Sequence, residues 1–294
     1  MSKKTVTVTI STKDRYFTTL PLTLLSICQQ TKTPDYLIIF DDGEQKDLRE
    51  YSVYESIFKL FDEKTIQWKV VFGKRTGQVS NHQMAIDNCE SDFIWRLDDD
   101  TCPEPNVLQR LYYKLNSDDN IGAVAGLVID PKSDYIVLPS IASNNIEHIH
   151  LGCNIQWFKH NNIKNIEVEH LYSSFLFRVE AAKHGYCMEL SPVGHREETI
   201  FTYEMKRAGW RLIVLNDVIT WHFRETSGGI RSYESEDYWK HDEFVFSKKL
   251  EEWHTHSKNQ KLFVLDSGLG DHYIFKKIFP KIKKMYGQTH RIVL

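Results

Sequence analysis

Two hydrophobic periods alternate along the N-terminal third of the chain, and this alternation limits the possible folds more than any other feature. The stretches TVTVTIST (5–12), DYLIIFDDG (35–43) and DFIWRLDDD (92–100) each contain a run of β-branched or other apolar residues, which favours strands. The stretches between them space their apolar residues as helices do. YLIIF is apolar throughout, which is typical of a parallel strand buried on both faces. The alternation predicts an α/β fold with right-handed crossovers.

The same periodicities assign elements to the remaining sequence. We expect a strand at 66–73, a further strand at 122–130 and a hairpin over the ligand crevice at 143–162. Residues 168–186 suggest a strand and the start of a helix, and residues 197–223 predict a helix, a strand and a second short strand that ends at His222. The helices predicted in the N-terminal third are TTLPLTLLSICQQT (18–31), SVYESIFKLFDE (52–63) and GQVSNHQMAIDNC (77–89).

Composition excludes several classes of protein. The chain has 294 residues, 41% of them hydrophobic, which suits one large domain with an appendage and argues against disorder. A net charge of -3 provides no basic field, so nucleic acid is not an expected partner. Five scattered cysteines without a CxxC pair indicate neither a disulfide framework nor a zinc site. With no signal-peptide core and no apolar run of about 18 residues, we expect a soluble, cytoplasmic protein without a transmembrane segment.

Three polar clusters directly follow predicted strands: STKDR (11–15), DDG (41–43) and DDD (98–100). Because ligands bind at the carboxyl ends of strands in such sheets, the three clusters should share one edge. Adjacent aspartates repel one another unless a positive group neutralises them, and Mg²⁺ or Mn²⁺ commonly binds through one or two carboxylates. Asp98 and Asp100, as alternate residues, can point into the same crevice. A solvated acidic turn is the other interpretation of this cluster.

The ordered set of these motifs resembles the family 2 glycosyltransferases of the GT-A fold, with Asp98 and Asp100 as the DxD pair. It implies a Rossmann-like, mixed and mostly parallel sheet flanked by helices. It also implies an inverting, metal-dependent transfer of a hexosyl or pentosyl group from a nucleotide-sugar donor, a UDP-sugar by default, to a hydroxyl of a glycan or glycoconjugate acceptor, as in polysaccharide biosynthesis. The resemblance covers roughly residues 5–230 and rests on VTISTKDR (8–15), DYLIIFDDG (35–43), GQVSNHQMAIDNCESDFIWRLDDDTCPEP (77–105) and REETIFTYEMKRAGWRLIVLNDVITWHFRETSGG (196–229).

The resemblance also implies roles for individual residues. Glu198, with Glu197 beside it, takes the position of the catalytic base. Asp98, Asp100 and His222 would hold Mn²⁺ or Mg²⁺, and imidazole is a reasonable ligand for manganese. The residues expected to bind the nucleotide-sugar are Thr12, Arg15, Asp41, Asn81, Asp98 and Asp99; Asn81 is suggested by GKRTGQVSN (73–81) itself, which also fits an ordinary start of a helix.

Simpler interpretations compete for the same residues. The helix dipole favours acids such as Glu197 and Glu198 at any helix N-terminus. A lone histidine after a strand, such as His222, is more often structural than a ligand. The sequence also departs from the family pattern, because Ile200 replaces a common acid and Glu204 stands where an arginine is often found. These departures concern the acceptor side and not the base itself.

Two other functions stay open. A nucleotidyltransferase also uses a Rossmann-like sheet with paired aspartates, although STKDRYFTTL (11–20) lacks the glycine- and arginine-rich phosphate loop expected there. A catalytically inactive glycan-binding or scaffold domain would keep the fold without the reaction. An inactive domain would have no reason to keep all of the site residues. Those present are Asp98, Asp100, Glu198 and His222.

The sequence divides into three predicted parts. Residues 1–235 would form the GT-A glycosyltransferase domain, 236–260 a helical extension or linker, and 261–294 a partial β-α-β unit. In its strand and glycine turn, the last part resembles the start of a GT-B transferase of the heptosyltransferase type. It would then begin a second transferase domain of a longer parent chain.

Overall fold

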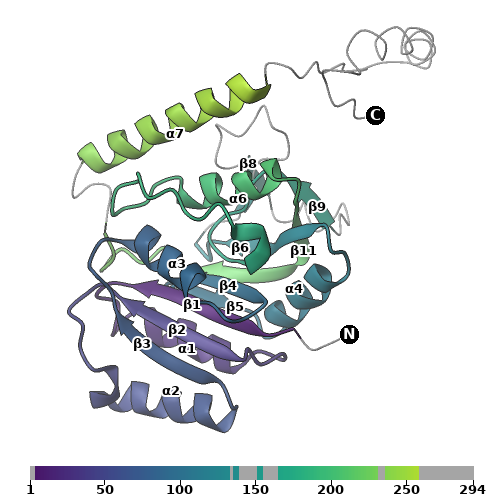
Figure 1. Ribbon diagram of the computed structural model, residues 1–294. Coiled ribbons are helices and arrows are strands. Elements are labelled where there is room, and N and C mark those ends of the chain that lie inside the picture. The colour runs from purple at the N-terminus through teal and green to yellow at the C-terminus, as the bar shows by residue number, and fades with distance from the viewer. Residues whose placement is uncertain (1–3, 133–134, 139–150, 155–164, 231–235, 258–294) are drawn as a thin grey trace, which may run out of the picture. The chain divides into compact units, whose positions relative to one another are not determined.

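The computed structural model describes residues 4–132, 135–138, 151–154, 165–230 and 236–257 (Figure 1). The chain separates into two compact units, Met1–Glu243 and Phe244–Leu294. The sheet and the candidate site belong to the first unit. In the second unit the described residues are the C-terminal part of helix α7 (Glu236–Ser257). The β-α-β unit predicted at 261–294 lies outside the described residues.

The first half of the sheet consists of β1 (Val6–Thr12), β2 (Tyr36–Asp41), β3 (Gln67–Phe72) and β4 (Phe93–Asp98). These strands are parallel, as the alternation of strands and helices predicts. β1 pairs with β2 on one side and with β4 on the other, and β2 pairs with β3. β2 is buried along almost its whole length, which explains its unbroken apolar sequence.

The second half of the sheet consists of β5 (Thr101–Pro103), β6 (Ile121–Ile129), β10 (Phe175–Arg178) and β11 (Arg211–His222). β10 joins the two halves, because it runs antiparallel between β4 and β6. The order along the sheet is β3-β2-β1-β4-β10-β6-β11-β5. Shorter strands extend it beside β6 and β11: β7 (Tyr135–Leu138), β8 (Leu151–Asn154) and β9 (Asn165–Val168).

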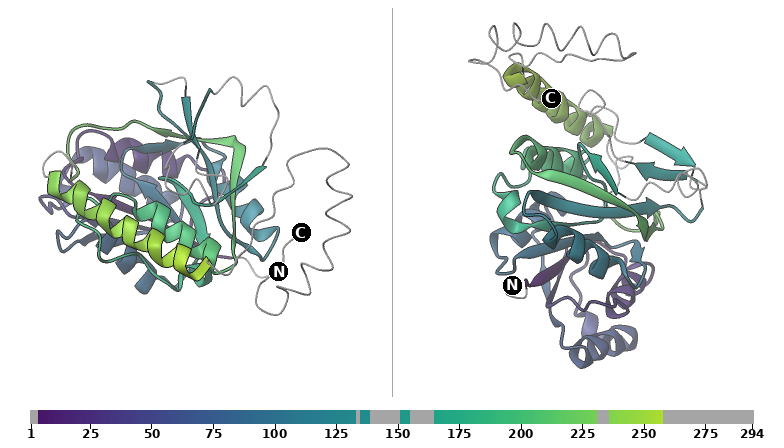
Figure 2. Two further views of the ribbon diagram at one scale, coloured as in Figure 1. Left: turned by 90° about the horizontal axis from the view of Figure 1, so that it is seen from above. Right: turned by 90° about the vertical axis from the view of Figure 1, so that its right-hand side faces the viewer.

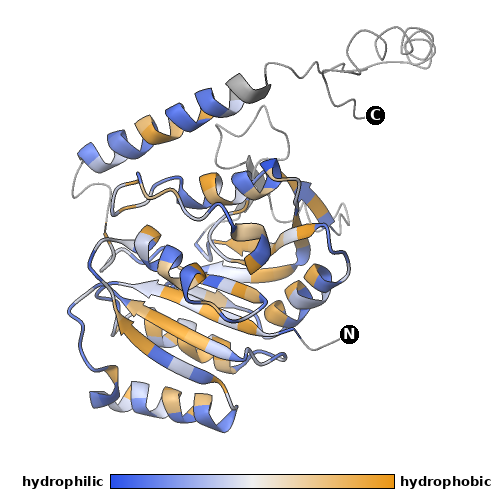
Figure 3. Ribbon diagram, in the orientation of Figure 1, coloured by the Kyte–Doolittle hydropathy of each residue, from blue (hydrophilic) through white to orange (hydrophobic). Residues whose placement is uncertain are grey.

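Helices lie on both faces of the sheet (Figure 2). One face is covered by α1 (Leu20–Cys28), α2 (Ser52–Glu63) and α4 (Val107–Asn116), which share one apolar cluster with the strands. The other face is covered by α3 (Gln78–Asp87) and α6 (Glu197–Arg207). Figure 3 shows the central strands mainly hydrophobic and α2 banded with polar and apolar residues. The predicted fold class, a mixed sheet flanked by helices, is confirmed. Single 3₁₀ turns occur at Leu48–Glu50 and Val179–Ala182.

The segment after α6 differs from the expected pair of strands. A single strand, β11, runs from Arg211 to His222, and its register with β6 shifts between Val214 and Ile219. A Cβ on Gly126 of β6 would lie 2.5 Å from the carbonyl oxygen of Val218. Glycine therefore lets the two backbones approach closely at the shift, and the strand continues through it. The predicted break is wrong because this irregularity is absorbed within the sheet.

Two further expectations concern partly described regions. β7 pairs with β8 in antiparallel orientation, but most of the hairpin predicted at 143–162 lies outside the described residues. Among the helices that the structure describes, none is both long and apolar enough to cross a membrane.

Leu24 and Leu22 of α1 provide a matched test of the core beneath the parallel strands. Leu24 is fully buried, whereas Leu22 is 48% exposed on the same helix. Leu24→Ala should lower the free energy of unfolding by about 2–5 kcal/mol, because apolar burial is lost and a cavity remains. Leu22→Ala should change it by less than about 0.5 kcal/mol. Urea denaturation followed by circular dichroism measures both, and equal losses would contradict this packing of α1.

Candidate functional site

The carboxyl ends of three parallel strands meet at one edge of the sheet. Thr12 at the end of β1 lies opposite Asp41 at the end of β2, and Ser11 lies opposite Asp98 at the end of β4. The short ladder between β5 and β11 then sets His222 opposite Thr101, directly after the aspartates. Segments far apart in the sequence therefore converge on the edge where the polar clusters were expected.

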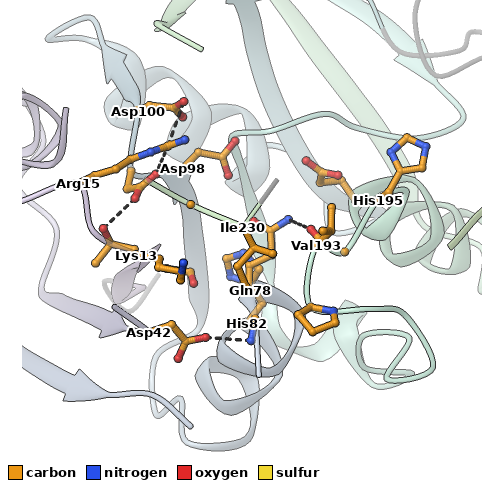
Figure 4. A pocket seen from close by; sticks show the side chains of 18 of the residues that line it. Lys13, Arg15, Asp42, Gln78, His82, Asp98, Asp100, Val193, His195 and Ile230 are labelled. Carbon is orange, nitrogen blue, oxygen red and sulfur yellow. Dashed lines mark hydrogen bonds and ion pairs between the residues drawn. The ribbon is translucent and has the colours of Figure 1, made fainter. Parts of the chain in front are cut away.

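A cavity of about 620 Å³ opens at this edge. Figure 4 shows Arg15 and Asp100 on one side of the view and Val193 and His195 on the other. Of the residues predicted from the sequence, Asp41, Asn81 and Glu197 are not among its described lining residues. The predicted residues that do line it are Thr12, Arg15, Asp98, Asp99, Asp100, Glu198 and His222.

Arg15 neutralises two of the three aspartates. Its guanidinium forms a buried ion pair with Asp99 and lies 3.0 Å from a carboxylate oxygen of Asp100. The Thr12 hydroxyl donates a 2.7 Å hydrogen bond to the other oxygen of Asp99. Burial raises the pKa of Asp99 to about 6, against the lowering effect of Arg15. Burial acts in the same direction on Asp100, but His222 and Arg15 outweigh it and lower the pKa of Asp100 to about 2.

Arg15 also fastens the loop that follows β11. It donates hydrogen bonds to the carbonyl oxygens of Ser227 at 3.2 Å and Glu225 at 3.1 Å. The Glu225 amide in turn donates to a carboxylate oxygen of Asp100 at 3.1 Å. A residue that the sequence suggests for the nucleotide pocket thus connects the aspartates to this loop.

Asp98, Asp100 and His222 bring oxygen and nitrogen donors into one cluster. One potential ligand atom from each lies within 4.8 Å of the other two. Nε2 of His222 lies 3.1 Å from Oδ1 of Asp100, while its buried Nδ1 has no hydrogen-bond partner among the described residues. Burial would lower the pKa of His222, but the hydrogen bond and charge of Asp100 leave it raised. Two carboxylates and an imidazole fit Mn²⁺, and the carboxylates also suit Mg²⁺.

Arg96 is the main residue of the site that sequence reasoning missed. It lies in β4, is 1% exposed, and pairs with Glu197. Its guanidinium also lies 3.2 Å from Asp98 and 3.5 Å from Glu198, and donates to Nε2 of His82 at 3.1 Å. Burial opposes this charge, but the three acids raise the pKa of Arg96 above its ordinary value. The signal was available in FIWRLD, because an arginine in an otherwise apolar, buried strand requires acidic partners.

The two adjacent glutamates at the start of α6 occupy different environments. Glu197 is buried against Arg96, and burial raises its pKa well above the usual range although Arg96 acts in the opposite direction. Glu198 lines the cavity, with 18% of its side chain exposed. One glutamate therefore holds Arg96, and its neighbour presents a carboxylate to the cavity.

The two acids after β2 are divided in a similar way. Asp41 is fully buried, and its two oxygens accept hydrogen bonds of 2.8 and 2.9 Å from the Tyr16 hydroxyl. Asp42 lines the cavity and accepts from the backbone amides of Arg75 and Gly77. Sequence reasoning selected Asp41 and passed over Asp42, because the DDG pattern does not reveal which carboxylate faces the cavity.

Helix α3 supports the cavity without placing Asn81 in its lining. Nδ2 of the buried Asn81 donates to the Ser11 hydroxyl at 2.8 Å, and the next residue, His82, lines the cavity. At the start of the helix, Gly77 has φ +94°, and a Cβ there would lie 2.2 Å from the carbonyl oxygen of Pro192. Glycine therefore allows the cavity-lining segment around Pro192 to pack against the start of α3.

The sequence matches a known family, and the fold matches known structures. The sequence model of the family described as Glycosyl transferase family 2 matches residues 7–184. The crystal structure of GalNAc-T7 with UDP, GalNAc and Mn²⁺ has a TM-score of 0.59 and 14% identity, over 78% of this chain and 45% of that chain. The crystal structure of S. aureus TarS has a TM-score of 0.51 and 14% identity, over 74% of this chain and 36% of that chain. A search of curated proteins finds no match.

These findings differ in what they show. The chain matches less than half of the length of either solved structure. At 14% identity, the two likenesses show the fold alone, which is GT-A. The family match spans more than half of the 294 residues and includes β1, β2 and the aspartates after β4. The chain therefore belongs to glycosyl transferase family 2.

Proposed function

We propose that the protein is an inverting, metal-dependent glycosyltransferase. It would move a hexosyl or pentosyl group from a nucleoside diphosphate sugar to a hydroxyl of a glycan or glycoconjugate acceptor. The observation that carries this proposal is that one cavity is lined both by the cluster of Asp98, Asp100 and His222 and by the carboxylate of Glu198. Sugar transfer requires both functions, neutralisation of a leaving diphosphate and acceptance of a proton from the attacking hydroxyl.

The cluster of Asp98, Asp100 and His222 would hold Mn²⁺ or Mg²⁺. When bound, such an ion supplies the Lewis acid that neutralises the departing nucleoside diphosphate. The similar GalNAc-T7 was solved with UDP and Mn²⁺, which supports UDP and Mn²⁺ as the first candidates for this chain.

The nucleotide would lie along the ends of β1, β2 and β4. Thr12 and Arg15 line the cavity there, and both contact Asp99. Asp41 and Asn81 are buried, so they would act by holding cavity residues in place. Asn81 would do so through Ser11, which lines the cavity, and Asp41 through Tyr16, the residue next to the cavity-lining Arg15.

Glu198 would be the catalytic base. Its carboxylate would take the proton of the acceptor hydroxyl while that oxygen attacks the anomeric carbon of the donor sugar. A single direct displacement of this kind inverts the anomeric configuration. Arg96, 3.5 Å from Glu198, would orient its carboxylate. Glu197 would hold Arg96 in place through their ion pair.

Nucleotide and metal binding can be tested by thermal shift. UDP, GDP, dTDP and CDP, each with and without Mn²⁺, would be added to the wild type and to Asp100→Asn. We expect UDP to raise the Tm of the wild type only when Mn²⁺ is present. At about 100 times Kd the stabilisation should be about 2.7 kcal/mol. Asp100→Asn should lose this gain, since a metal-ligand oxygen is replaced by an amide.

The exposed Asp217 provides the control for this substitution, because Asp217→Asn removes the same charge at a residue that does not line the cavity. It should keep the full metal-dependent gain. An equal gain in Asp100→Asn would exclude Asp100 from the metal site. No gain with any of the four nucleotides would favour the inactive scaffold.

Glu198→Gln and Glu197→Gln should have contrasting effects. Glu198→Gln removes the proton acceptor, so kcat should fall by about 10²–10⁴-fold while UDP affinity changes less than about twofold. Glu197→Gln removes the closest acidic partner of the buried Arg96, so it should lower the free energy of unfolding by about 3 kcal/mol. UDP release from UDP-sugars with a panel of glycoside acceptors measures the first, and urea denaturation measures the second. If Glu198→Gln turns over at the wild-type rate, Glu198 is excluded as the catalytic base.

A further inference from the structure

An exposed tryptophan on α7 lines the same cavity as Glu198. Trp239 is 43% exposed, although tryptophan is highly buried on average. Its ring stacks on the imidazole of His195, with 3.6 Å between ring centroids and 26° between the planes. His195 also lines the cavity and precedes Glu198 by three residues. Because His195 covers one face of the tryptophan, a ligand would have to contact the opposite face or the ring edge.

Two acids of α7 hold this ring pair in place. Asp242 is fully buried and accepts hydrogen bonds from the backbone amides of Ser191 at 2.6 Å and His195 at 2.8 Å. Glu243 lies 2.7 Å from Nε2 of His195 and accepts from Nε of Arg196 at 2.8 Å. The ring pair is therefore positioned by the protein itself, which reduces the side-chain entropy that the protein would lose when a ligand stacks there.

The chemistry of the ring pair suits a pyranose ring. Burial lowers the pKa of His195, which favours the neutral form of the imidazole that stacks on Trp239. An aromatic face binds the C–H groups on one side of a sugar, and the hydroxyl groups at the sugar edge require polar partners. Arg196 and Glu198 line the same cavity and can provide them. In Figure 4, His195 lies well apart from Arg15 and Asp100 in the view, away from the proposed nucleotide site.

We propose that Trp239, backed by His195, is the platform on which the acceptor sugar stacks, with its reacting hydroxyl directed toward Glu198. The inference rests on the proposed transferase function of the cavity. It identifies the acceptor as a pyranoside and makes Trp239 a residue that determines acceptor affinity. Trp239 would not contribute to binding of the donor nucleotide.

Saturation-transfer NMR with methyl glycosides tests this platform. The probes are the methyl β-glycosides of glucose, galactose, N-acetylglucosamine and N-acetylgalactosamine, added to protein saturated with UDP and Mn²⁺. Trp239→Ala should weaken binding of the best probe about tenfold, which corresponds to about 1.4 kcal/mol. Trp239→Phe keeps an aromatic face, so its binding should stay within about threefold of the wild type. Tyr238→Ala is the matched control, since Tyr238 is a neighbouring aromatic that is 36% exposed and does not line the cavity.

Each outcome either supports Trp239 as the acceptor platform or excludes it from that role. UDP affinity should be the same in all four proteins. If Trp239→Ala binds the probes like the wild type, or if no probe binds the UDP-loaded wild type, the platform is overturned. If Trp239→Ala binds UDP-glucose more weakly but UDP equally well, the ring serves the donor sugar and the acceptor assignment is overturned. If UDP does not bind the wild type, the proposed function fails, and the probes without nucleotide still decide whether Trp239 holds a sugar.

Discussion

The candidate site depends on one buried charge, the guanidinium of Arg96. Removing an arginine from water is unfavourable unless acids and hydrogen-bond acceptors surround it. Arg96 obtains these partners from its own strand through Asp98, from α6 through Glu197 and Glu198, and from α3 through His82. Because the contacts must form together, they fix two helices against the face of β4. Loss of Glu197 would remove the closest acidic partner of Arg96 and weaken the contact between β4 and α6.

The three consecutive aspartates are tolerated because the protein supplies cations of its own. Arg15 contacts Asp99 and Asp100, and Arg96 approaches Asp98. The repulsion that a run of carboxylates implies is therefore largely offset within the fold. Under the proposed function, Asp98 and Asp100 would remain able to contribute metal ligands where a diphosphate requires neutralisation.

Much of the fold could be predicted because its elements leave local signatures. The helix expected at 52–63 is α2 (Ser52–Glu63), since its apolar residues follow a helical period without interruption. The local sequence does not indicate which of two adjacent carboxylates faces the cavity. Asp41 is held by Tyr16 and Glu197 by Arg96, so their neighbours Asp42 and Glu198 face the cavity. These partners come from remote segments and become evident only when the chain is folded.

The start of α7 bears on where the chain can be divided. Composition changes after about residue 230, and the first domain is predicted to end at 235; the first compact unit of the structure includes residues up to Glu243. A fragment ending at 235 would lack Asp242 and leave the backbone amides of Ser191 and His195 without their acceptor. It would also lose Trp239 from the cavity lining. A fragment meant to isolate the catalytic part of the chain should therefore retain α7 at least through Glu243.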